Sequence, residues 1–185
     1  QLKEKSTACA VPLRKGRDRL VELSLSQELK IKIESSFDLA EKAVVSFSEI
    51  PDEPEGLFMA YRALRYVPYA AEMLYPAVRD SVAVSRYFLE EAVQEDLLRL
   101  ERLRNAPVRE DTGILHFSNE REKKGGCSIY IPEDYDPDRA YPIVTALHGG
   151  SGHGRAFLWT WLKEARSREF ILISPTARGD TWALM

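Results

Sequence analysis

Ile143-Val-Thr-Ala-Leu147 runs directly into His148-Gly-Gly-Ser-Gly-His-Gly154. The first five residues carry no charge and are mostly apolar on both faces, which is typical of a buried parallel strand. Arg155–Arg168 has the spacing of an amphipathic helix, and Phe170–Ile173 predicts a second buried strand that ends at Ser174-Pro175. A strand, a Gly-rich loop, a helix and a strand in this order form a βαβ unit, whose crossover makes the two strands parallel.

Two further strand candidates precede this unit. Ile114–Phe117 is a short strand candidate, and Cys127–Ile131 alternates in the manner of a half-buried strand. Residues 132–138, which follow, are dense in turn-forming residues. We therefore expect a partial α/β domain with about four strands over residues 108–185.

The sequence before residue 108 has the three- and four-residue apolar spacing of amphipathic helices. The clearest stripe comprises Leu29, Ile33, Phe37, Ala40, Val44 and Phe47. Prolines interrupt the later repeats, and Asn105-Ala106-Pro107 ends them. The pattern predicts an all-helical module over residues 25–107. Residues 1–24 mix charged and small side chains, so we expect a poorly ordered lead-in there.

Composition excludes several classes of function. The chain has 185 residues, 44% of them hydrophobic and 30% charged, and a formal net charge of -3. A surface that binds nucleic acid by neutralising phosphates therefore has no electrostatic basis. No apolar run approaches the roughly 18–20 residues that span a bilayer. Cys9 and Cys127 are too few for a zinc cage; two free thiols are expected, with a single bridge as the alternative. We expect no cofactor and no metal.

A Gly-rich loop between a strand and a helix has three common uses. A phosphate loop requires Lys and then Ser or Thr after its last glycine, where this chain has Arg155 and Ala156. A dinucleotide loop that begins at Gly150 requires a small residue at position 155, which is again Arg. An oxyanion loop requires only backbone that can approach a substrate carbonyl, which glycines permit. The third use is therefore favoured.

Three motifs occur in the order found in one enzyme family. They are Tyr130-Ile-Pro-Glu-Asp-Tyr-Asp-Pro137, Tyr141-Pro-Ile-Val-Thr-Ala-Leu-His-Gly-Gly150 and Phe170-Ile-Leu-Ile-Ser-Pro175. With them, residues 112–185 resemble the N-terminal part of an α/β-hydrolase domain. The nearest members are the phospholipase/carboxylesterase and polyhydroxybutyrate-depolymerase-like esterases. The resemblance implies a serine hydrolase acting on a small-molecule ester or lipid-like substrate.

The resemblance also implies roles for the loop. In that family one oxyanion N–H belongs to the residue just after the His-Gly pair, which here is Gly150. Ser151 is the next candidate donor, Gly149 frames the turn, and His148 is expected to brace the loop. These residues are the predicted catalytic contribution of the chain.

His153, Trp159 and Trp182 are the candidate substrate-binding residues. Each has a structural alternative. A histidine between two glycines is typical of a turn, and a tryptophan on the helix after the loop is typical of packing between helix and sheet. Trp182 follows the last strand, in a region that borders the cleft in such enzymes.

The nucleophile of the family is absent from this sequence. No Gly-x-Ser-x-Gly elbow occurs, and no histidine follows His153 to activate Ser151. The expectation is therefore that these residues form the front part of a longer esterase and are inactive alone. A prolyl-oligopeptidase-like peptidase, or a non-catalytic binding protein that uses the helical module, stays open as an alternative.

The third strand of the resembled fold lies between the fourth and the fifth. Without a fifth strand, one edge of Ile143–Leu147 would be open, which favours aggregation. We expect this edge to be covered by further chain, by self-association or a partner chain, or by the helical module. A cytoplasmic location is expected, although a leader removed before Gln1 would also fit.

Overall fold

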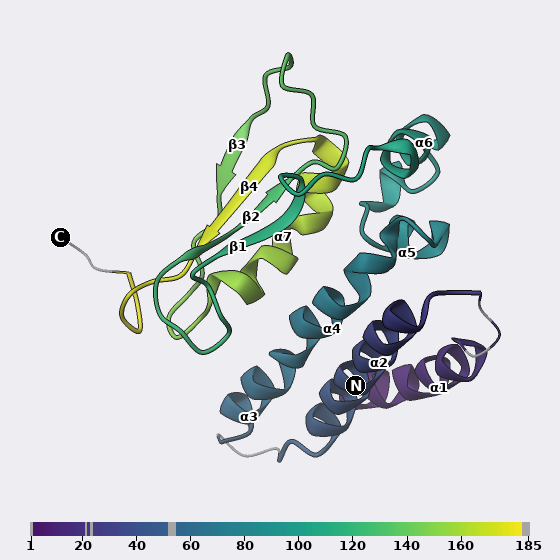
Figure 1. The fold of residues 1–185 in the computed structure, drawn as a ribbon. Coiled ribbons are helices and arrows are strands. Elements are labelled where there is room, and N and C mark those ends of the chain that lie inside the picture. Colours follow the sequence, from purple (N-terminus) through teal and green to yellow (C-terminus); the bar gives the residue numbers. More distant parts are fainter. Residues whose placement is uncertain (1, 21, 23, 52–54, 183–185) are drawn as a thin grey trace. The chain divides into compact units, whose positions relative to one another are not determined.

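The computed structural model describes the chain except for residues 1, 21, 23, 52–54 and 183–185 (Figure 1). It divides into two compact units, Gln1–Asp80 and Ser81–Met185. The first is helical, and the second combines helices with a mixed four-stranded sheet. The predicted α/β class is therefore confirmed at the level of a mixed sheet with helices.

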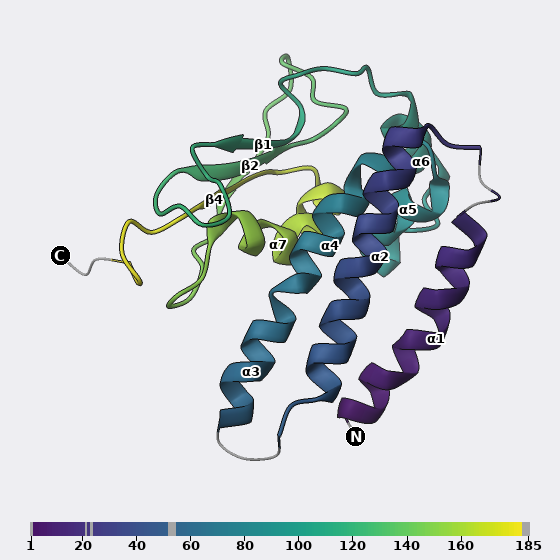
Figure 2. The same ribbon diagram turned by 60° about the horizontal axis from the view of Figure 1, so that its bottom comes forward.

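Helices α1 (Leu2–Leu20), α2 (Gln27–Ser48), α3 (Glu55–Leu64), α4 (Tyr66–Leu74) and the 3-10 turn η1 (Tyr75–Val78) form the first unit. Figure 2 shows α2 running between α1 and α4. Ser26 begins α2, because its side chain accepts a hydrogen bond from the Leu29 amide. The predicted apolar stripe is buried in part, at Leu29 and Ile33.

The expectation of a poorly ordered lead-in is corrected by α1, which occupies most of those residues. Arg17 pairs with Asp38 and Glu41 on α2, and Leu20 is 3% exposed. A Cβ on Gly16 would lie 3.1 Å from the Phe37 ring, so the two helices pack closely there. The residues of α1 alone do not reveal this partner, which is why composition suggested disorder.

The boundary between the units also differs from the expected one. Helix α5 (Val82–Tyr87), the turn η2 (Glu91–Val93) and α6 (Leu97–Asn105) group with the sheet rather than with the helical module. The Glu90 amide, for example, donates to Ser167 Oγ at 2.8 Å. Helical spacing identifies a helix but not the core on which it packs, so the sequence placed the boundary too late.

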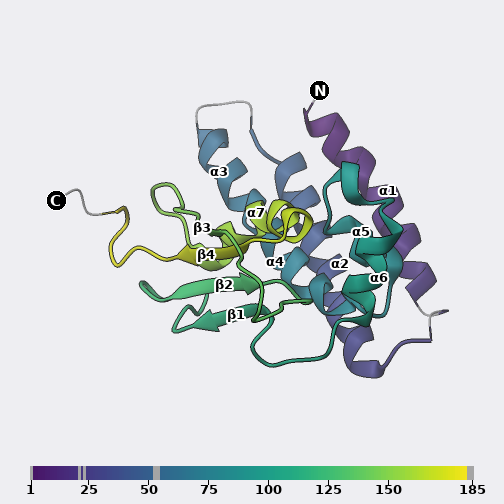
Figure 3. The same cartoon turned by 90° about the horizontal axis from the view of Figure 1, so that it is seen from above.

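The sheet consists of β1 (Gly113–Phe117), β2 (Cys127–Ile131), β3 (Ile143–Thr145) and β4 (Ile171–Pro175). Their order is β1-β2-β4-β3 (Figure 3). β2 is antiparallel to both β1 and β4, whereas β3 and β4 are parallel with Ile143 opposite Ile171. The parallel strand pair predicted from the βαβ pattern is thus confirmed.

Helix α7 (Gly154–Arg168) covers one face of this sheet. Residues alternate strictly between buried and half-buried along β2 and β4, with Tyr130 and Leu172 fully buried on the covered face. The opposite face carries Ile129 and Ile173, which are half-buried. One-sided coverage therefore explains the period-two pattern.

The prediction of a buried strand at residues 143–147 is wrong in one respect. β3 pairs only with β4 among the described residues, and Ile143 and Leu147 are 64% and 55% exposed. An uncharged strand sequence does not distinguish a central strand from an edge strand, because the neighbours of the strand decide its burial.

Candidate functional site

The glycine-rich loop forms a tight turn after β3. The Gly152 amide donates to the Gly149 carbonyl at 3.0 Å, which places Gly150 and Ser151 at the two central positions. Ser151 has φ of 58°, the left-handed value that the third position of a type II turn requires. A Cβ on Gly152 would lie 2.9 Å from the Gly149 oxygen, so this position has no room for a side chain.

The four consecutive amides of this turn have different environments. The Ser151 amide donates to the Asp180 carbonyl at 2.7 Å, and the Gly152 amide donates to the Gly149 carbonyl within the turn. Neither Gly149 nor Gly150 donates its amide to any acceptor in the described part of the chain. Both residues are exposed, and a Cβ on either would meet no atom within 4 Å. Two adjacent N–H groups, those of Gly149 and Gly150, are thus open to an incoming acceptor. The prediction that the Ser151 amide donates to an oxyanion is wrong, because this amide already donates to Asp180.

His148 is 3% exposed and fixed through both ring nitrogens. Its Nε2 accepts from the Ala177 amide at 3.1 Å, so the proton resides on Nδ1, which donates to the Gly149 carbonyl at 2.7 Å. The ring therefore connects the loop to the segment after β4, which is the geometry that a bracing residue requires.

Trp182 lies beside the same histidine. Its indole Nε1–H donates to the His148 carbonyl at 2.8 Å, and the two ring centroids are 4.8 Å apart. Together with the carbonyl of Asp180, this side chain holds the loop from the segment that follows β4. The described contacts of Trp182 thus support the loop.

His153 is the N-cap of α7 rather than an open side chain. Its Nδ1 accepts from the Arg155 amide at 3.2 Å, and its Nε2 donates to the Lys123 carbonyl at 3.0 Å. Burial lowers the pKa of His153 below its ordinary value of 6.5, and the hydrogen bond to Lys123 acts in the opposite direction. Both ring nitrogens serve the scaffold, which corrects the expectation of a substrate contact.

The first amides of α7 are all capped within the protein. The Gly154 amide donates to Thr176 Oγ1 at 2.9 Å, and the amides of Ala156 and Phe157 donate to the His153 carbonyl. A phosphate loop needs these amides to be open toward its ligand. The structure therefore gives a second reason, besides Arg155, against phosphate binding at this loop.

Trp159 faces a different part of the unit. Its ring lies against Phe88, with centroids 6.0 Å apart, and Phe88 is 2% exposed. The residue therefore packs α7 against the end of α5, which is a packing role, but against a helix rather than against the sheet that the structural alternative named. Of the candidate residues, the structure gathers His148, Gly149, Gly150, Ser151 and Trp182 in one place.

Behind the loop lies a buried network of polar side chains that the sequence did not predict. Thr176 Oγ1 donates to Asn119 Oδ1 at 2.6 Å, and Asn119 Nδ2 donates to Ser128 Oγ at 2.8 Å. Ser128 in turn contacts His116 Nδ1 at 2.7 Å. This network fixes Thr176 Oγ1, the oxygen that accepts the hydrogen bond from the Gly154 amide. Small polar residues are common near strand ends, so nothing in the sequence signalled that these residues form a network.

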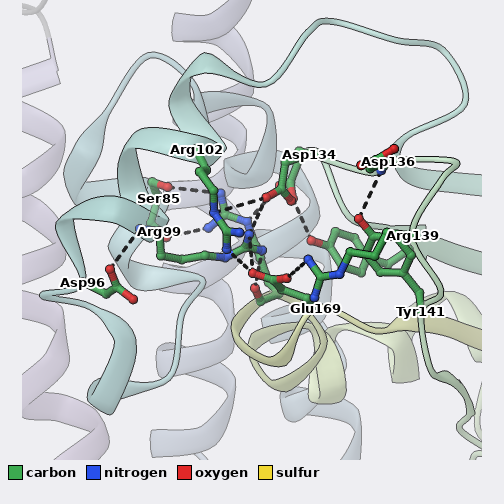
Figure 4. Close-up of polar contacts among 12 residues, drawn as sticks. Ser85, Asp96, Arg99, Arg102, Asp134, Asp136, Arg139, Tyr141 and Glu169 are labelled. Carbon is green, nitrogen blue, oxygen red and sulfur yellow. Dashed lines mark hydrogen bonds and ion pairs between the residues drawn. The ribbon is translucent and has the colours of Figure 1, made fainter.

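A second missed cluster ties the short helices to α7 (Figure 4). Arg99 is 2% exposed and contacts Asp134 Oδ2 at 2.5 Å and Glu169 Oε1 at 3.0 Å. Glu169 also pairs with Arg102 and Arg139. Burial raises the pKa of Glu169, but these three arginines outweigh it and hold that pKa below its ordinary value.

Arg166 forms the inner part of the same cluster. It is 1% exposed, donates through Nε to Glu133 Oε1 at 2.8 Å, and donates to the Ser85 carbonyl at 2.7 Å. Tyr130 Oη donates to the other oxygen of Glu133 at 2.6 Å. Because its charges are paired internally, this cluster is structural.

Within the described ranges, no group of three His, Cys, Asp or Glu side chains is placed to hold a metal ion. No helix among these residues combines the length and apolarity needed to cross a bilayer. Comparisons of the chain with protein-family models, with curated proteins and with solved structures found no match. The loop geometry and the sequence motifs are therefore the features of the chain that bear on its function.

Proposed function

We propose that residues 148–152 form the oxyanion loop of a serine-type carboxylic-ester hydrolase. The observation that carries the proposal is the pair of amides of Gly149 and Gly150, which have no acceptor within the described residues. Adjacent N–H groups on a fixed loop suit the oxygen of an ester carbonyl, on which negative charge develops during nucleophilic attack.

Rigidity supports this use of the loop. Donors stabilise a transition state best when they do not have to reorganise as charge develops. The His148 ring holds the turn from within the loop, and Trp182 and the carbonyl of Asp180 hold it from the segment after β4. The exposed amides are therefore positioned before any substrate arrives.

The strand order also supports the assignment. In the α/β-hydrolase fold that the motifs resemble, the third strand lies on the far side of the fourth, and the loop follows the third strand directly. The chain has the same arrangement, with β3 beside β4 and the glycines immediately after β3. The shared strand order supports the proposed scaffold only. The proposed stabilisation of an oxyanion depends on the amides of Gly149 and Gly150.

Ser151 does not serve as the nucleophile in this proposal. Both ring nitrogens of His148 and of His153 are engaged in hydrogen bonds to the backbone. Neither imidazole is placed to remove the Ser151 proton, as a nucleophilic serine requires. The nucleophile, acid and base are assigned to residues beyond this sequence. Accordingly, the 185-residue chain should not hydrolyse p-nitrophenyl acetate.

A titration with butylphosphonate, a stable mimic of the tetrahedral intermediate, tests the proposal. Gly150→Pro removes one N–H and suits the second position of a type II turn, whereas Gly150→Ala retains the N–H in open space. A hydrogen bond to a charged group contributes about 1.5–3 kcal/mol, so the proline variant should bind roughly 10- to 100-fold more weakly. The alanine variant should bind like the parent chain.

Equal affinity of the proline and alanine variants would contradict the role of Gly150. Absence of phosphonate binding to the parent chain would also count against the proposal. Ester turnover by the parent chain that Ser151→Ala abolishes would show instead that this loop carries the nucleophile.

A further inference from the structure

Helix α3 directs small residues toward the protein and large apolar side chains toward solvent. Gly56 and Ala63 are buried, and the helix lies beside α2 in the first unit (Figure 2). A Cβ on Gly56 would lie 2.2 Å from the Pro51 carbonyl oxygen, so the two backbones approach closely there. Half of the ten residues of α3 are large, apolar and between 43% and 68% exposed: Leu57, Phe58, Met59, Tyr61 and Leu64.

These five side chains form one surface, which we call the α3 face. Leu57, Tyr61 and Leu64 are spaced by four and three residues and therefore lie along one side of the helix, which Phe58 widens. A helix that only covers a core directs its large apolar residues inward, so the usual arrangement is reversed. Single exposed apolar residues are ordinary, but a contiguous set of them marks an interaction surface.

The charges beside the α3 face are positive. Arg62 and Arg65 are exposed, and no Asp or Glu occurs between Gly56 and Ala71. Arg62 lies one helical turn after Phe58, so a basic side chain flanks the apolar residues. Large apolar side chains together with basic ones are typical of a helix that lies in the surface of a membrane with anionic lipids.

A lipid surface fits the α3 face better than further protein does. The additional chain that the proposed function requires continues the sheet beside β3, which belongs to the second unit, whereas α3 belongs to the first. The backbone of a helix is hydrogen-bonded internally, so the face offers only apolar surface and two arginines. Binding to a membrane needs only these two features.

We propose that α3 docks the protein on the surface of a membrane that contains anionic lipids. The α3 face enters the boundary between headgroups and acyl chains, and Arg62 and Arg65 lie at the level of the lipid phosphates. The ten residues of the helix extend about 15 Å, and they lie along the surface. Docking does not depend on the oxyanion loop, but it brings a lipid-like ester, the substrate class of the proposed function, close to the protein.

Cosedimentation of the 185-residue chain with lipid vesicles tests the proposal. One set of vesicles is pure phosphatidylcholine, and the other is phosphatidylcholine mixed with phosphatidylglycerol. The parent chain should bind the mixed vesicles more strongly. Leu57→Asp combined with Leu64→Asp should weaken this binding at least about tenfold, because two apolar side chains no longer enter the lipid.

Leu97→Asp combined with Leu98→Asp is the matched control. These residues are 70% and 75% exposed on α6, in the second unit, and the control changes the net charge of the chain by the same amount. Aspartate is favourable in the first turn of a helix, so α6 should be retained. The control should bind mixed vesicles like the parent, and circular dichroism verifies that both double variants are folded.

Arg62→Gln separates the contribution of charge from that of the apolar contact. It should weaken binding to the mixed vesicles about fivefold and leave binding to pure phosphatidylcholine unchanged.

Absence of binding to the mixed vesicles overturns the proposal, and so does an equal loss of binding in the two double variants. If sedimentation velocity without lipid shows a dimer that the Leu57→Asp, Leu64→Asp variant does not form, the α3 face is a protein interface and the proposal is wrong. Gly150→Pro leaves α3 intact, so it should bind vesicles like the parent even where it no longer binds butylphosphonate. Membrane docking and the oxyanion loop are therefore tested separately.

Discussion

His148 and His153 lie five positions apart in the same loop and carry their protons on different nitrogens. His148 accepts at Nε2 from the backbone, whereas His153 accepts at Nδ1. The sequence suggested a structural role for one and a substrate contact for the other. The Ala177 amide, which donates to His148, and the Lys123 carbonyl, which accepts from His153, lie 29 and 30 residues away along the chain. Hydrogen-bond partners of this kind cannot be obtained from local spacing.

The depressed pKa of His153 makes stability depend on pH. Above its ordinary value of 6.5 the ring is neutral in the folded and the unfolded chain, and its contribution to stability is complete. As pH falls below 6.5, the unfolded chain binds the proton first, so the free energy of unfolding decreases until the folded ring also titrates. Urea unfolding at pH 7.5 and pH 5.5 measures this decrease.

His153→Asn is the matched variant, because asparagine also caps helices and does not titrate. The loss of stability between pH 7.5 and 5.5 should be smaller in this variant than in the parent. An equal or larger loss would show that His153 does not couple folding to pH.

The junction of α7 with β4 depends on close approach of two backbones. A Cβ on Gly154 would lie 2.4 Å from the Ser174 carbonyl oxygen and 2.5 Å from that of Pro175. Glycine at the start of the helix is therefore a packing requirement, although the sequence identified Gly154 only as the last residue of the Gly-rich loop.

Gly154→Ala should destabilise the sheet unit by about 1–3 kcal/mol, the usual cost of overpacking. This loss should occur even though alanine favours helix over glycine. Gly150→Ala is the control, since its Cβ meets no atom within 4 Å and should change stability by less than about 0.5 kcal/mol. Similar stability of the two variants in urea unfolding would contradict the close packing at α7.

At the level of elements, the strands and the βαβ crossover were predictable from the sequence. Period-two alternation and the glycine-rich loop are local signals, and they identified β2, β3, α7 and β4. Helix α1 and the exposure of β3 were not predictable, because each depends on what lies beside the element. The family motif predicted the amide of Gly150 as a donor, but it gave Gly149 only a place in the turn. The open amide of Gly149 and the engagement of Ser151 by Asp180 both required coordinates.

For the whole molecule, the buried ion cluster explains where the second unit begins. Arg166 on α7 reaches Ser85 on α5, and Arg99 on α6 reaches the carbonyl of Arg166. Charged residues in a sequence normally indicate solvated faces, so nothing in their spacing revealed that these arginines are buried. The helical segments 81–105 were consequently assigned to the wrong unit.

Glu133→Gln tests how strongly this cluster stabilises the second unit. The substitution leaves the buried Arg166 without its carboxylate, and breaking a buried pair from one side costs about 3–5 kcal/mol. Glu164→Gln is the matched control, because its partner Arg168 is largely exposed and such an i,i+4 pair on a helix contributes about 0.3–0.5 kcal/mol. Comparable losses in the two variants, measured by urea unfolding, would contradict a structural role for the cluster.

The availability of the loop amides is tested most directly by their exchange with water in ¹H–¹⁵N NMR. The four amides from Gly149 to Gly152 lie in one turn, and only the last two have acceptors among the described residues. Gly149 and Gly150 should exchange near the rate of an unstructured chain, and Ser151 and Gly152 should be protected. Protection of Gly150 equal to that of Ser151 would show that its amide is already engaged, and the loop would then have no donor for an oxyanion.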